Sequence, residues 1–523
     1  MAQILIFGDV TNVHGFGREA GAVKIASVLR ASGYKCQVVD YFSDFTFSEL
    51  QTVLDLYVTT ETLWVGFSTT HFAQAMPAER LLELESKANT RVFEFSRECK
   101  YFPFDDQFME EVFAEIRRRN PNCRIVVGGF KAGYTQDFPG VDYWVVGDGE
   151  GAALALTASL VGTNTSLKTS PAKSGQILNG NHDYPCIQEF PNFGMLWDGS
   201  DHLQSNEFLP VEIARGCSFR CRFCNYSLTG NGQILRNMDS LRDEFLRNYE
   251  MYSIKGYLFV DHMVNDSVAK LRDLCEMISR LPFEIEWSGF LRLDLIHKYP
   301  EMRDLLLGSG LRSAQFGIET LNPKALKAIG KGLAPEKLIR TLQFLRETWK
   351  DRVVMGTGLI VGLPDDSWES IDETIDFFLD PDAPIDSVIV SPLSIRKYDQ
   401  KWTSFQSFSE YSLHPRKYGF TMTPDGWESD IFTRTNTVEY VRRLYASSRF
   451  RQKKRFADYH GYSRIRSLGF SHHEIYNKSI SDVEFIRQVS QRKGVAVNHY
   501  KQQILNGHAT PQVRTPSMSR GSG

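Results

Sequence analysis

The chain has 523 residues, more than one ordinary hydrophobic core contains, so its length predicts two or three domains. Its charges nearly balance, with 60 Lys and Arg against 63 Asp and Glu, and no apolar run approaches the roughly 18 residues of a membrane span. The eight cysteines, three of them clustered and the rest scattered, argue against a disulfide framework, so a reducing cytoplasmic setting is expected.

Residues 1–160 alternate short apolar strands with amphipathic helices. A strand over 3–9 begins almost at the N-terminus, which lacks the charged start and the cleavage site of a signal peptide. A helix over 19–32 shows apolar residues at helical spacing and ends at Gly33. Further strands are predicted at 36–40, 63–68, 124–129 and 143–147. This alternation predicts a Rossmann-like, doubly wound parallel sheet with ligands at the carboxyl ends of its strands.

Residues 161–206 differ in character from the domain before them. Stretches such as Asn179-Gly-Asn-His182 show no periodicity, and prolines and glycines interrupt the remainder. We therefore expect a linker that leads from the first domain to the next one.

The most informative stretch is Val211–Asn225, where a short apolar strand runs into a loop with Cys217, Cys221 and Cys224. Three thiols at this spacing can converge on one face of a loop. A four-cysteine zinc site or an ordinary ferredoxin cluster needs a fourth cysteine in a recognisable partner position. A cluster held by three cysteines leaves one iron open for chemistry. The alternative interpretation is a structural zinc loop or three buried cysteines.

Six strand–helix units over 207–400 begin at this loop. The first unit continues into an amphipathic helix over 238–252. The later strands are predicted at 255–261, 284–290, 312–319, 353–362 and 386–391, with intervening helices at 267–280, 300–309, 335–348 and 368–379. Such a repeat predicts a partial (β/α)₆ barrel of the TIM type, whose functional residues lie at the carboxyl ends of the strands.

Polar residues occupy the predicted strand ends of this barrel. Asp261 and His262 end the second strand, Arg292 follows the third, and Glu319 ends the fourth. A single acidic residue in such a place is more often a loop cap than a ligand. Asp261 and His262 could equally orient a substrate, and the sequence does not separate these two roles.

The CxxxCxxC spacing, with Phe223 before the last cysteine, resembles the radical S-adenosylmethionine (SAM) superfamily. The stretches Gly317-Ile-Glu-Thr320 and Gly358-Leu-Ile-Val-Gly-Leu-Pro364 are similar to that family as well. The resemblance implies that the three cysteines hold a [4Fe–4S] cluster whose open iron binds SAM. It also implies that a reductant such as flavodoxin or ferredoxin drives cleavage of SAM to a 5′-deoxyadenosyl radical.

The same resemblance assigns cofactor contacts to residues of the barrel. It implies that Arg292 and Glu319 grip the carboxylate and the ribose of SAM. It further implies that Gly358 and Gly362 let the backbone approach the adenine and that Phe223 packs beside it.

The first domain resembles the cobalamin-binding domain that precedes many radical SAM cores. The similarity lies in the stretches 22–40, 126–129 and 141–150. The resemblance implies that Gly128, Gly129 and Gly147 let a corrin lie on the strand ends. It also implies that His14 and Gly17 belong to the loop that carries an axial ligand.

That loop departs from the family pattern, which is Asp-x-His-x-x-Gly. His14-Gly-Phe-Gly17 keeps the second half, but Asp9 lies five residues before the histidine, where the pattern has two. A lower axial histidine normally needs a carboxylate on its other ring nitrogen. Cobalamin binding with or without His14 as ligand therefore stays open, as does a cleft that is empty or repurposed. His71, at another strand end, is interpreted as a polar loop residue.

The region 401–505 is predicted to be mainly helical, and residues 506–523 are predicted to be disordered. From about residue 437 onward this region is basic, and aromatic residues such as Phe450 and Tyr462 interleave with the charges. The usual explanation is a solvated helix face. The alternative is a surface for an anionic partner such as nucleic acid, on which the aromatic rings would stack. Buried helix faces also contain aromatic residues, so the rings alone do not decide between these explanations.

The sequence therefore predicts a cytoplasmic radical SAM enzyme. If the first domain binds cobalamin, the enzyme is expected to be a methyltransferase that acts on an unactivated carbon. One alternative is a radical SAM oxidoreductase, cyclase or rearrangement enzyme without cobalamin. Another, from a different class, is a nucleic-acid-binding protein with a structural cluster. The sequence does not indicate which small molecule or peptide is the substrate.

Overall fold

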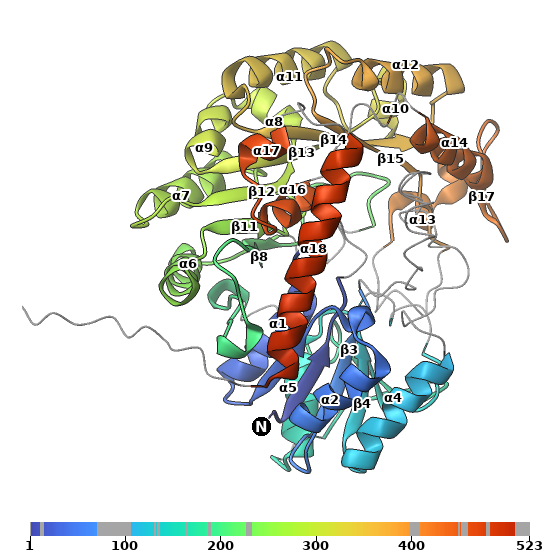
Figure 1. The fold of residues 1–523 in the computed structure, drawn as a ribbon. Helices are drawn as coiled ribbons and strands as arrows, with labels where there is room; N and C mark the ends of the chain where they lie inside the picture. Colours follow the sequence, from blue (N-terminus) through green and yellow to red (C-terminus); the bar gives the residue numbers. More distant parts are fainter. Residues whose placement is uncertain are drawn as a thin grey trace, which may run out of the picture.

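The computed structural model shows two parallel sheets, each flanked by helices, and a long C-terminal helix that runs across both (Figure 1). Among the helices of the described residues, none combines the length and the apolar character needed to cross a membrane. The predicted α/β class is confirmed. The described residues are 2–10, 15–70, 106–129, 132, 136–163, 166–186, 190–225, 233–397, 408–447, 450, 459–476 and 482–507.

The first sheet has the strand order β2-β1-β3-β4-β5-β7-β6, and all its pairings are parallel except that of β6 with β7. The strands of its Rossmann-like part are β1 (Ile4–Phe7), β2 (Cys36–Val39), β3 (Trp64–Ser68), β4 (Arg124–Gly128) and β5 (Tyr143–Val146). Each of these strands lies within two residues of its predicted bounds. Short apolar runs of this kind suit strands that are buried on both faces.

Helices cover both faces of the first sheet, as expected for a doubly wound fold (Figure 1). Ile4 and Ile6 pack in one apolar cluster with α1 and α5, whereas Leu5 and Phe7 pack in another with α2 and α4. Successive side chains of β1 therefore point to opposite layers. These helices are α1 (Ala20–Ala31), α2 (Phe47–Tyr57), α4 (Asp106–Arg119) and α5 (Glu150–Leu160).

The segment 161–206, for which the sequence predicts a linker, instead extends the first sheet. β7 (Gln176–Asn179) pairs in parallel with β5, and β6 (Ser170–Pro171) pairs with β7 at the edge. Ile177 and Leu178 are buried. The strand escaped prediction because two apolar residues in a row show neither the alternation nor the length that marks a strand.

The second sheet has six parallel strands in the order β15-β14-β13-β12-β11-β8, so the chain adds each new strand beside the previous one. The strands are β8 (Phe208–Val211), β11 (Gly256–Phe259), β12 (Glu286–Leu291), β13 (Leu311–Glu319), β14 (Val354–Val361) and β15 (Ser387–Pro392). This order brings all six carboxyl ends to one edge, which is where the sequence places the polar residues.

The helices between these strands agree closely with the sequence pattern, and α6 and α12 have the predicted bounds. Side chains cap the starts of α6, α7, α10 and α12; for example, the Ser267 hydroxyl accepts a hydrogen bond from the Lys270 amide. The short helices α8 and α10 were not predicted. The set is α6 (Met238–Tyr252), α7 (Val268–Ser279), α8 (Leu293–Lys298), α9 (Met302–Gly308), α10 (Pro323–Ala328), α11 (Pro335–Trp349) and α12 (Trp368–Leu379).

The C-terminal region contributes part of the core. α16 (Tyr459–Arg466) packs against the second sheet near the amino ends of its strands, where Arg466 pairs with Glu286 at 2.6 Å. Tyr462 is buried there against Phe208, and Phe450 is buried elsewhere in the second core. Neither of these aromatic rings can stack on a nucleic-acid base, which removes part of the argument for an RNA or DNA surface.

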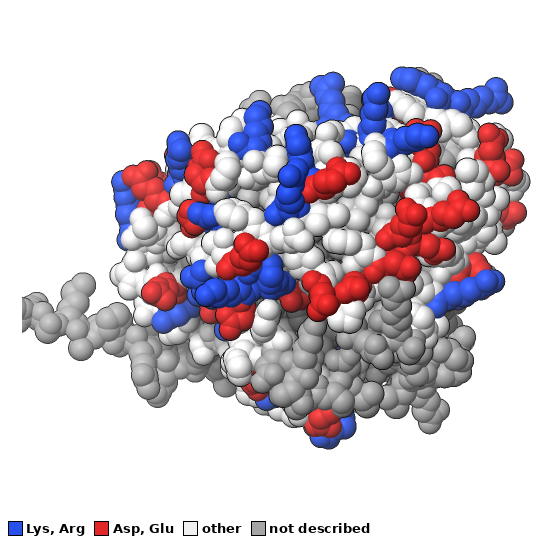
Figure 2. Space-filling view, turned by 90° about the horizontal axis from the view of Figure 1, so that it is seen from above, with Lys and Arg blue, Asp and Glu red and all other residues white. Residues whose placement is uncertain are grey.

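Charge on the described surface is mixed in sign. Figure 2 shows acidic and basic side chains together on the face above α11 and α12. In the basic region, Arg442 and Arg443 on α14 (Arg434–Ala446) both bond to Glu439. Residues 451–458, which carry much of the predicted basic charge, lie outside the described residues.

α18 (Asp482–Leu505) fastens the two sheets to each other (Figure 1). Toward the first sheet, Lys501 pairs with Glu49 at 2.8 Å, and the Tyr57 hydroxyl donates to the Ile504 carbonyl at 3.2 Å. Toward the second sheet, Phe485 and Val489 of α18 belong to the same apolar cluster as Phe208 of β8 and Val354 of β14. The helix therefore acts as a brace between the domains.

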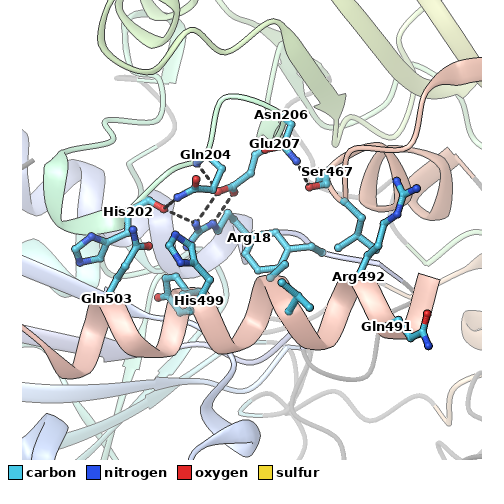
Figure 3. A pocket seen from close by; sticks show the side chains of 15 residues that line it. Arg18, His202, Gln204, Asn206, Glu207, Ser467, Gln491, Arg492, His499 and Gln503 are labelled. Carbon is cyan, nitrogen blue, oxygen red and sulfur yellow. Dashed lines mark hydrogen bonds and ion pairs between the residues drawn. The ribbon is translucent and has the colours of Figure 1, made fainter. Parts of the chain in front are cut away.

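A buried ion pair lies beneath α18, at the floor of a hollow of about 390 Å³ (Figure 3). Arg18 Nε and Nη2 bond to the two carboxylate oxygens of Glu207 at 2.7 and 2.8 Å, and each side chain is only 2% exposed. The Arg18 guanidinium also faces the Tyr500 ring of α18 at 4.6 Å. One side chain thus joins the first domain, the entry to β8 and the brace.

The Asp261 carboxylate fixes the start of the cysteine loop, which comprises residues 216–233. Asp261 follows β11 and is buried, and it accepts hydrogen bonds from the Ile213 amide at 3.1 Å and from the Ala214 amide. It therefore holds the chain between the end of β8 and the first cysteine in place.

We expect Arg18→Met to lower the free energy of unfolding by about 3–5 kcal/mol, because Glu207 would stay buried without its partner. Urea denaturation followed by circular dichroism measures this change. The double variant Arg18→Met/Glu207→Leu should recover most of the loss, since it removes both buried charges. A single variant as stable as the wild type would contradict the assigned role of the pair.

We expect Asp261→Ala to lower the free energy of unfolding by about 1–3 kcal/mol, because two buried amides would lose their acceptor. The measurement is the same denaturation, with Asp273→Ala on the exposed side of α7 as the matched control. If both substitutions changed the free energy of unfolding equally, the assigned role of Asp261 at the base of the cysteine loop would be wrong.

Candidate cluster and cofactor site

The cysteine loop leaves the second sheet at a sharp turn and is closed at its base. Gly216 has a φ of +87°, a backbone conformation that glycine adopts without strain. β9 (Ala214–Arg215) and β10 (Ile234–Leu235) form an antiparallel pair across the two ends of the loop. The Arg222 guanidinium donates to the Ala328 carbonyl at 2.7 Å and so fastens the loop to α10.

Cys217, Cys221 and Cys224 all lie in this loop, and each is partly exposed. Among the described residues, no three His, Cys, Asp or Glu side chains converge closely enough to bind one metal ion. The resemblance implies an iron–sulfur cluster on these cysteines, in which each thiolate binds a different iron. Burial raises the pKa of Cys217, so iron binding there would displace a proton.

Arg292 lies at the cysteine loop, directly after β12. Its guanidinium stacks on the Phe219 ring at 3.9 Å and bonds to both carboxylate oxygens of Asp294. The nitrogen Nη1 points to the sulfur of Cys221 at 3.6 Å. The structure thus brings the predicted arginine to the predicted cysteines, although the resemblance had implied a contact with SAM.

Glu319 has the backbone geometry of a functional position. Its φ is +73°, and the register of β13 against β14 shifts between Gly317 and Glu319. Such strain costs about 1–3 kcal/mol and persists where the surrounding structure imposes it, often at active sites. Lys331 bonds to the Glu319 carboxylate at 2.8 Å. The ribose-binding role that the resemblance implies for Glu319 remains a prediction.

The three other residues expected to contact SAM have different surroundings. A Cβ on Gly358 would lie 3.9 Å from Gln315, its nearest described neighbour, so space is available beside this backbone. Gly362 has a φ of +96°, and a Cβ there would meet Trp427 and Thr437 at 2.9 Å, so backbone and packing both favour glycine. Its contact with the adenine stays a prediction. Phe223 packs against the core of the second domain.

Asp261 and His262, predicted as substrate contacts, diverge in the structure. Asp261 is buried and engaged with the backbone at the base of the cysteine loop, which makes it an anchor. His262 is exposed. The role of His262 toward a substrate stays a prediction.

A cavity of about 400 Å³ separates the first sheet from the base of the cysteine loop. From the first domain, it is lined by the predicted Gly128, Gly129 and Gly147 at the strand ends. From the second domain, Glu212 and Arg215 line it, and Arg215 is two residues before the first cysteine. The cavity therefore joins the two regions in which the sequence predicts cofactors.

The glycines serve the cavity in two ways. Gly129 and Gly147 have φ values of +88° and +86°, and a Cβ on them would meet Thr69 at 2.8 Å and Asn181 at 2.6 Å. A Cβ on Gly128 would touch Val145 at an ordinary 3.6 Å. Gly129 and Gly147 are therefore required by the backbone, whereas Gly128 keeps space free.

Opposite charges surround Arg215 at the mouth of the cavity. Its guanidinium lies 2.7 Å from Glu150, 2.9 Å from Glu212 and 3.6 Å from Asp148. Burial alone would raise the pKa of Glu212, but Arg215 outweighs it and the pKa is lowered, so Glu212 stays ionised. Lys24 lies 3.5 Å from Glu212 on the other side. The sequence analysis missed this network, because its members come from distant segments.

The loop over residues 9–17, in which the resemblance places an axial ligand of cobalamin, is only partly described. His14 and His71 lie outside the described residues. The Gly17 amide donates to the Tyr41 hydroxyl at 2.9 Å, and Gly17 is not among the described residues that line the cavity. A buried carboxyl, Glu19, bonds to the hydroxyl of the cavity residue Ser68. Burial raises the pKa of Glu19 well above its usual range, which favours its protonated form.

Two curated methyltransferases are related to this chain at low identity. An uncharacterized methyltransferase of Pyrococcus horikoshii is 25% identical over 273 residues, which is 49% of this chain and 58% of that protein. The bacteriochlorophyllide d C-12(1)-methyltransferase of Chlorobaculum tepidum is 23% identical over 244 residues, which is 44% of this chain and 52% of that protein. The chain thus spans little more than half the length of each of these relatives.

Solved structures share the fold over nearly the whole chain. The methyltransferase TsrM from Kitasatospora setae, with cobalamin and a [4Fe–4S] cluster bound, has a TM-score of 0.59 and 16% identity and covers 94% of this chain and 100% of its own. OxsB, with aqua-cobalamin and SAM bound, has a TM-score of 0.54 and 14% identity, covering 96% and 80%. Residues 211–378 match the family model of the radical SAM superfamily. This chain therefore contains a radical SAM domain.

Proposed function

We propose that the chain is a cobalamin-dependent radical SAM enzyme that transfers a methyl group to an unactivated carbon. The observation that carries this proposal is a cavity shared by the strand ends of the first sheet and the base of the cysteine loop. A cofactor in that cavity would touch Gly128 on one side and Arg215 on the other. Two cofactors that act on one substrate need such proximity.

The residues of the chain fit the cofactors that this function needs. Cys217, Cys221 and Cys224 would hold a [4Fe–4S] cluster, and Glu319 with the backbone at Gly358 would bind SAM. When bound, the cluster and SAM supply a 5′-deoxyadenosyl radical, and cobalamin supplies a methyl group. The protein positions these groups and excludes water from them.

Two features of the cavity lining would favour a corrin. Gly128 leaves space above the strand end, as a flat macrocycle requires. The carboxylates of Glu150 and Glu212 could accept hydrogen bonds from the amide arms of a corrin. Relatives named as methyltransferases, and similar folds that contain cobalamin, support the same proposal.

The remaining partners follow from this chemistry. A low-potential one-electron donor, such as flavodoxin or ferredoxin, would reduce the cluster. Because such clusters are sensitive to oxygen, a cytoplasmic location is part of the proposal. The substrate would be a small molecule or a peptide that reaches the carboxyl ends of the second sheet.

The alternatives make different predictions. A radical SAM oxidoreductase, cyclase or rearrangement enzyme without cobalamin would retain no corrin after reconstitution and gel filtration. A nucleic-acid-binding protein with a structural cluster would bind RNA or DNA in a salt-dependent way and form no 5′-deoxyadenosine. The buried Phe450 and Tyr462 weaken this second alternative.

We expect Cys221→Ala to abolish SAM cleavage and most of the brown colour after anaerobic reconstitution with iron and sulfide, because two thiolates cannot hold the cluster. The measurements are absorbance and 5′-deoxyadenosine formed with dithionite. Cys275→Ala is the matched control, since Cys275 is a partly exposed cysteine outside the loop. Full SAM cleavage by Cys221→Ala would refute the proposed cluster.

We expect Gly128→Leu to reduce the cobalamin retained after gel filtration at least tenfold, because the new side chain would enter the cavity without striking the backbone. The iron content of the same sample should not change. Gly308→Leu, on the exposed end of α9, controls for the added side chain. If Gly128→Leu retained as much cobalamin as the wild type, the cofactor would not bind in this cavity.

A further inference from the structure

The guanidinium of Arg292 is held at the cysteine loop by three neighbours. Nε and Nη2 donate to the two oxygens of Asp294 at 2.8 and 2.6 Å. The ring of Phe219, which belongs to the loop itself, lies 3.9 Å from the guanidinium carbon. The third nitrogen, Nη1, points to the Cys221 sulfur at 3.6 Å. Each part of the planar group therefore has its own partner.

The backbone beneath this side chain is fixed as well. The Asn265 side chain accepts a hydrogen bond from the Arg292 amide at 2.8 Å and donates one to the Arg292 carbonyl at 3.0 Å. Asp294 lies two residues later, in the first turn of α8. Burial alone would raise the pKa of Asp294, but Arg292 outweighs it and the pKa is lowered, so the carboxylate stays ionised.

This arrangement leaves Arg292 poorly suited to grip a SAM carboxylate. A bidentate grip uses two parallel N–H groups, and Asp294 already occupies such a pair. Only 6% of the Arg292 side chain is exposed, so a SAM carboxylate that took the same pair of N–H groups would have to displace Asp294. Of the three N–H groups that Asp294 does not use, the two on Nη1 lie toward the sulfur of Cys221.

We propose that Arg292 sets the reduction potential of the cluster by donating a hydrogen bond to Cys221, and that Asp294 limits the size of this effect. The inference rests on the cluster of the proposed function. Hydrogen bonds to cluster sulfurs and nearby charge tune such potentials. Arginine keeps its charge at every accessible pH, so it stabilises the more negative, reduced cluster and raises the potential. Asp294 offsets part of that charge.

Two substitutions in this pair test the inference because they should shift the potential in opposite directions. Arg292→Gln should lower the cluster potential enough to change the reduction equilibrium about tenfold, or about 59 mV for one electron. Asp294→Asn should raise it, because the arginine charge is then no longer offset. The measurement is an anaerobic redox titration of the reconstituted full chain without SAM, followed by electron paramagnetic resonance.

Controls separate tuning from structural damage. Arg312→Gln removes an arginine at the amino end of β13, where it pairs with Glu286 at 3.3 Å, and should leave the potential unchanged. Arg292→Lys keeps the positive charge but loses the planar guanidinium with its fixed N–H donors. The cluster potential of this variant should therefore lie between those of the wild type and Arg292→Gln. If Arg292→Gln holds no cluster, Arg292→Lys and Asp294→Asn still give opposite shifts that decide the question.

Three results would overturn the inference. A shift of both variants in the same direction would indicate a displaced loop. An unchanged cluster potential in Arg292→Gln, together with weaker SAM binding measured by calorimetry, would show that Arg292 binds SAM and does not tune the cluster. A wild-type chain that assembles no cluster would refute the proposed function itself, and so is distinguishable from the other two.

Discussion

The contact on which this structure depends is the one between Arg215 and the carboxylates around it. Glu150 belongs to the first domain and Glu212 to the second, and Arg215 bonds to both at 2.7 and 2.9 Å just before the cysteine loop. Removing a buried charge from water costs several kcal/mol, which these partners must offset. The contact therefore adds little stability, but it fixes the base of the cysteine loop relative to the first sheet.

The local features of the fold were predictable from the sequence. The helices over 238–252 and 368–379 have the predicted bounds, because apolar spacing marks such helices. The fourth strand of the second sheet ends at Glu319 as expected. β7 was missed because two buried residues give no periodic signal. The sequence did not decide whether Tyr462 is buried or exposed, because its burial depends on Phe208, which is distant in sequence.

For the site, the sequence predicted the identity of the important residues better than it predicted their roles. Spacing alone placed the three cysteines in one loop, and the resemblance placed Gly128 in a cleft that the structure contains. The roles of Asp261 and Arg292 could not be predicted, because each depends on the group that the side chain faces. Asp261 faces backbone amides of the strand before the cysteines, and Arg292 faces a cysteine sulfur. Such partners are set by tertiary packing.

A rigid joint between the domains also follows from the chemistry proposed here. The cavity has walls from both sheets, so a rotation of one domain would change its shape. Arg18 with Glu207, Arg215 with its carboxylates, and the brace formed by α18 all oppose such a rotation from different sides. Buried ion pairs are poor contributors to stability but can hold a particular orientation. In the proposed reaction, a radical formed at one cofactor would react productively only if the second stayed at a fixed distance, so these contacts would serve that reaction more than the fold.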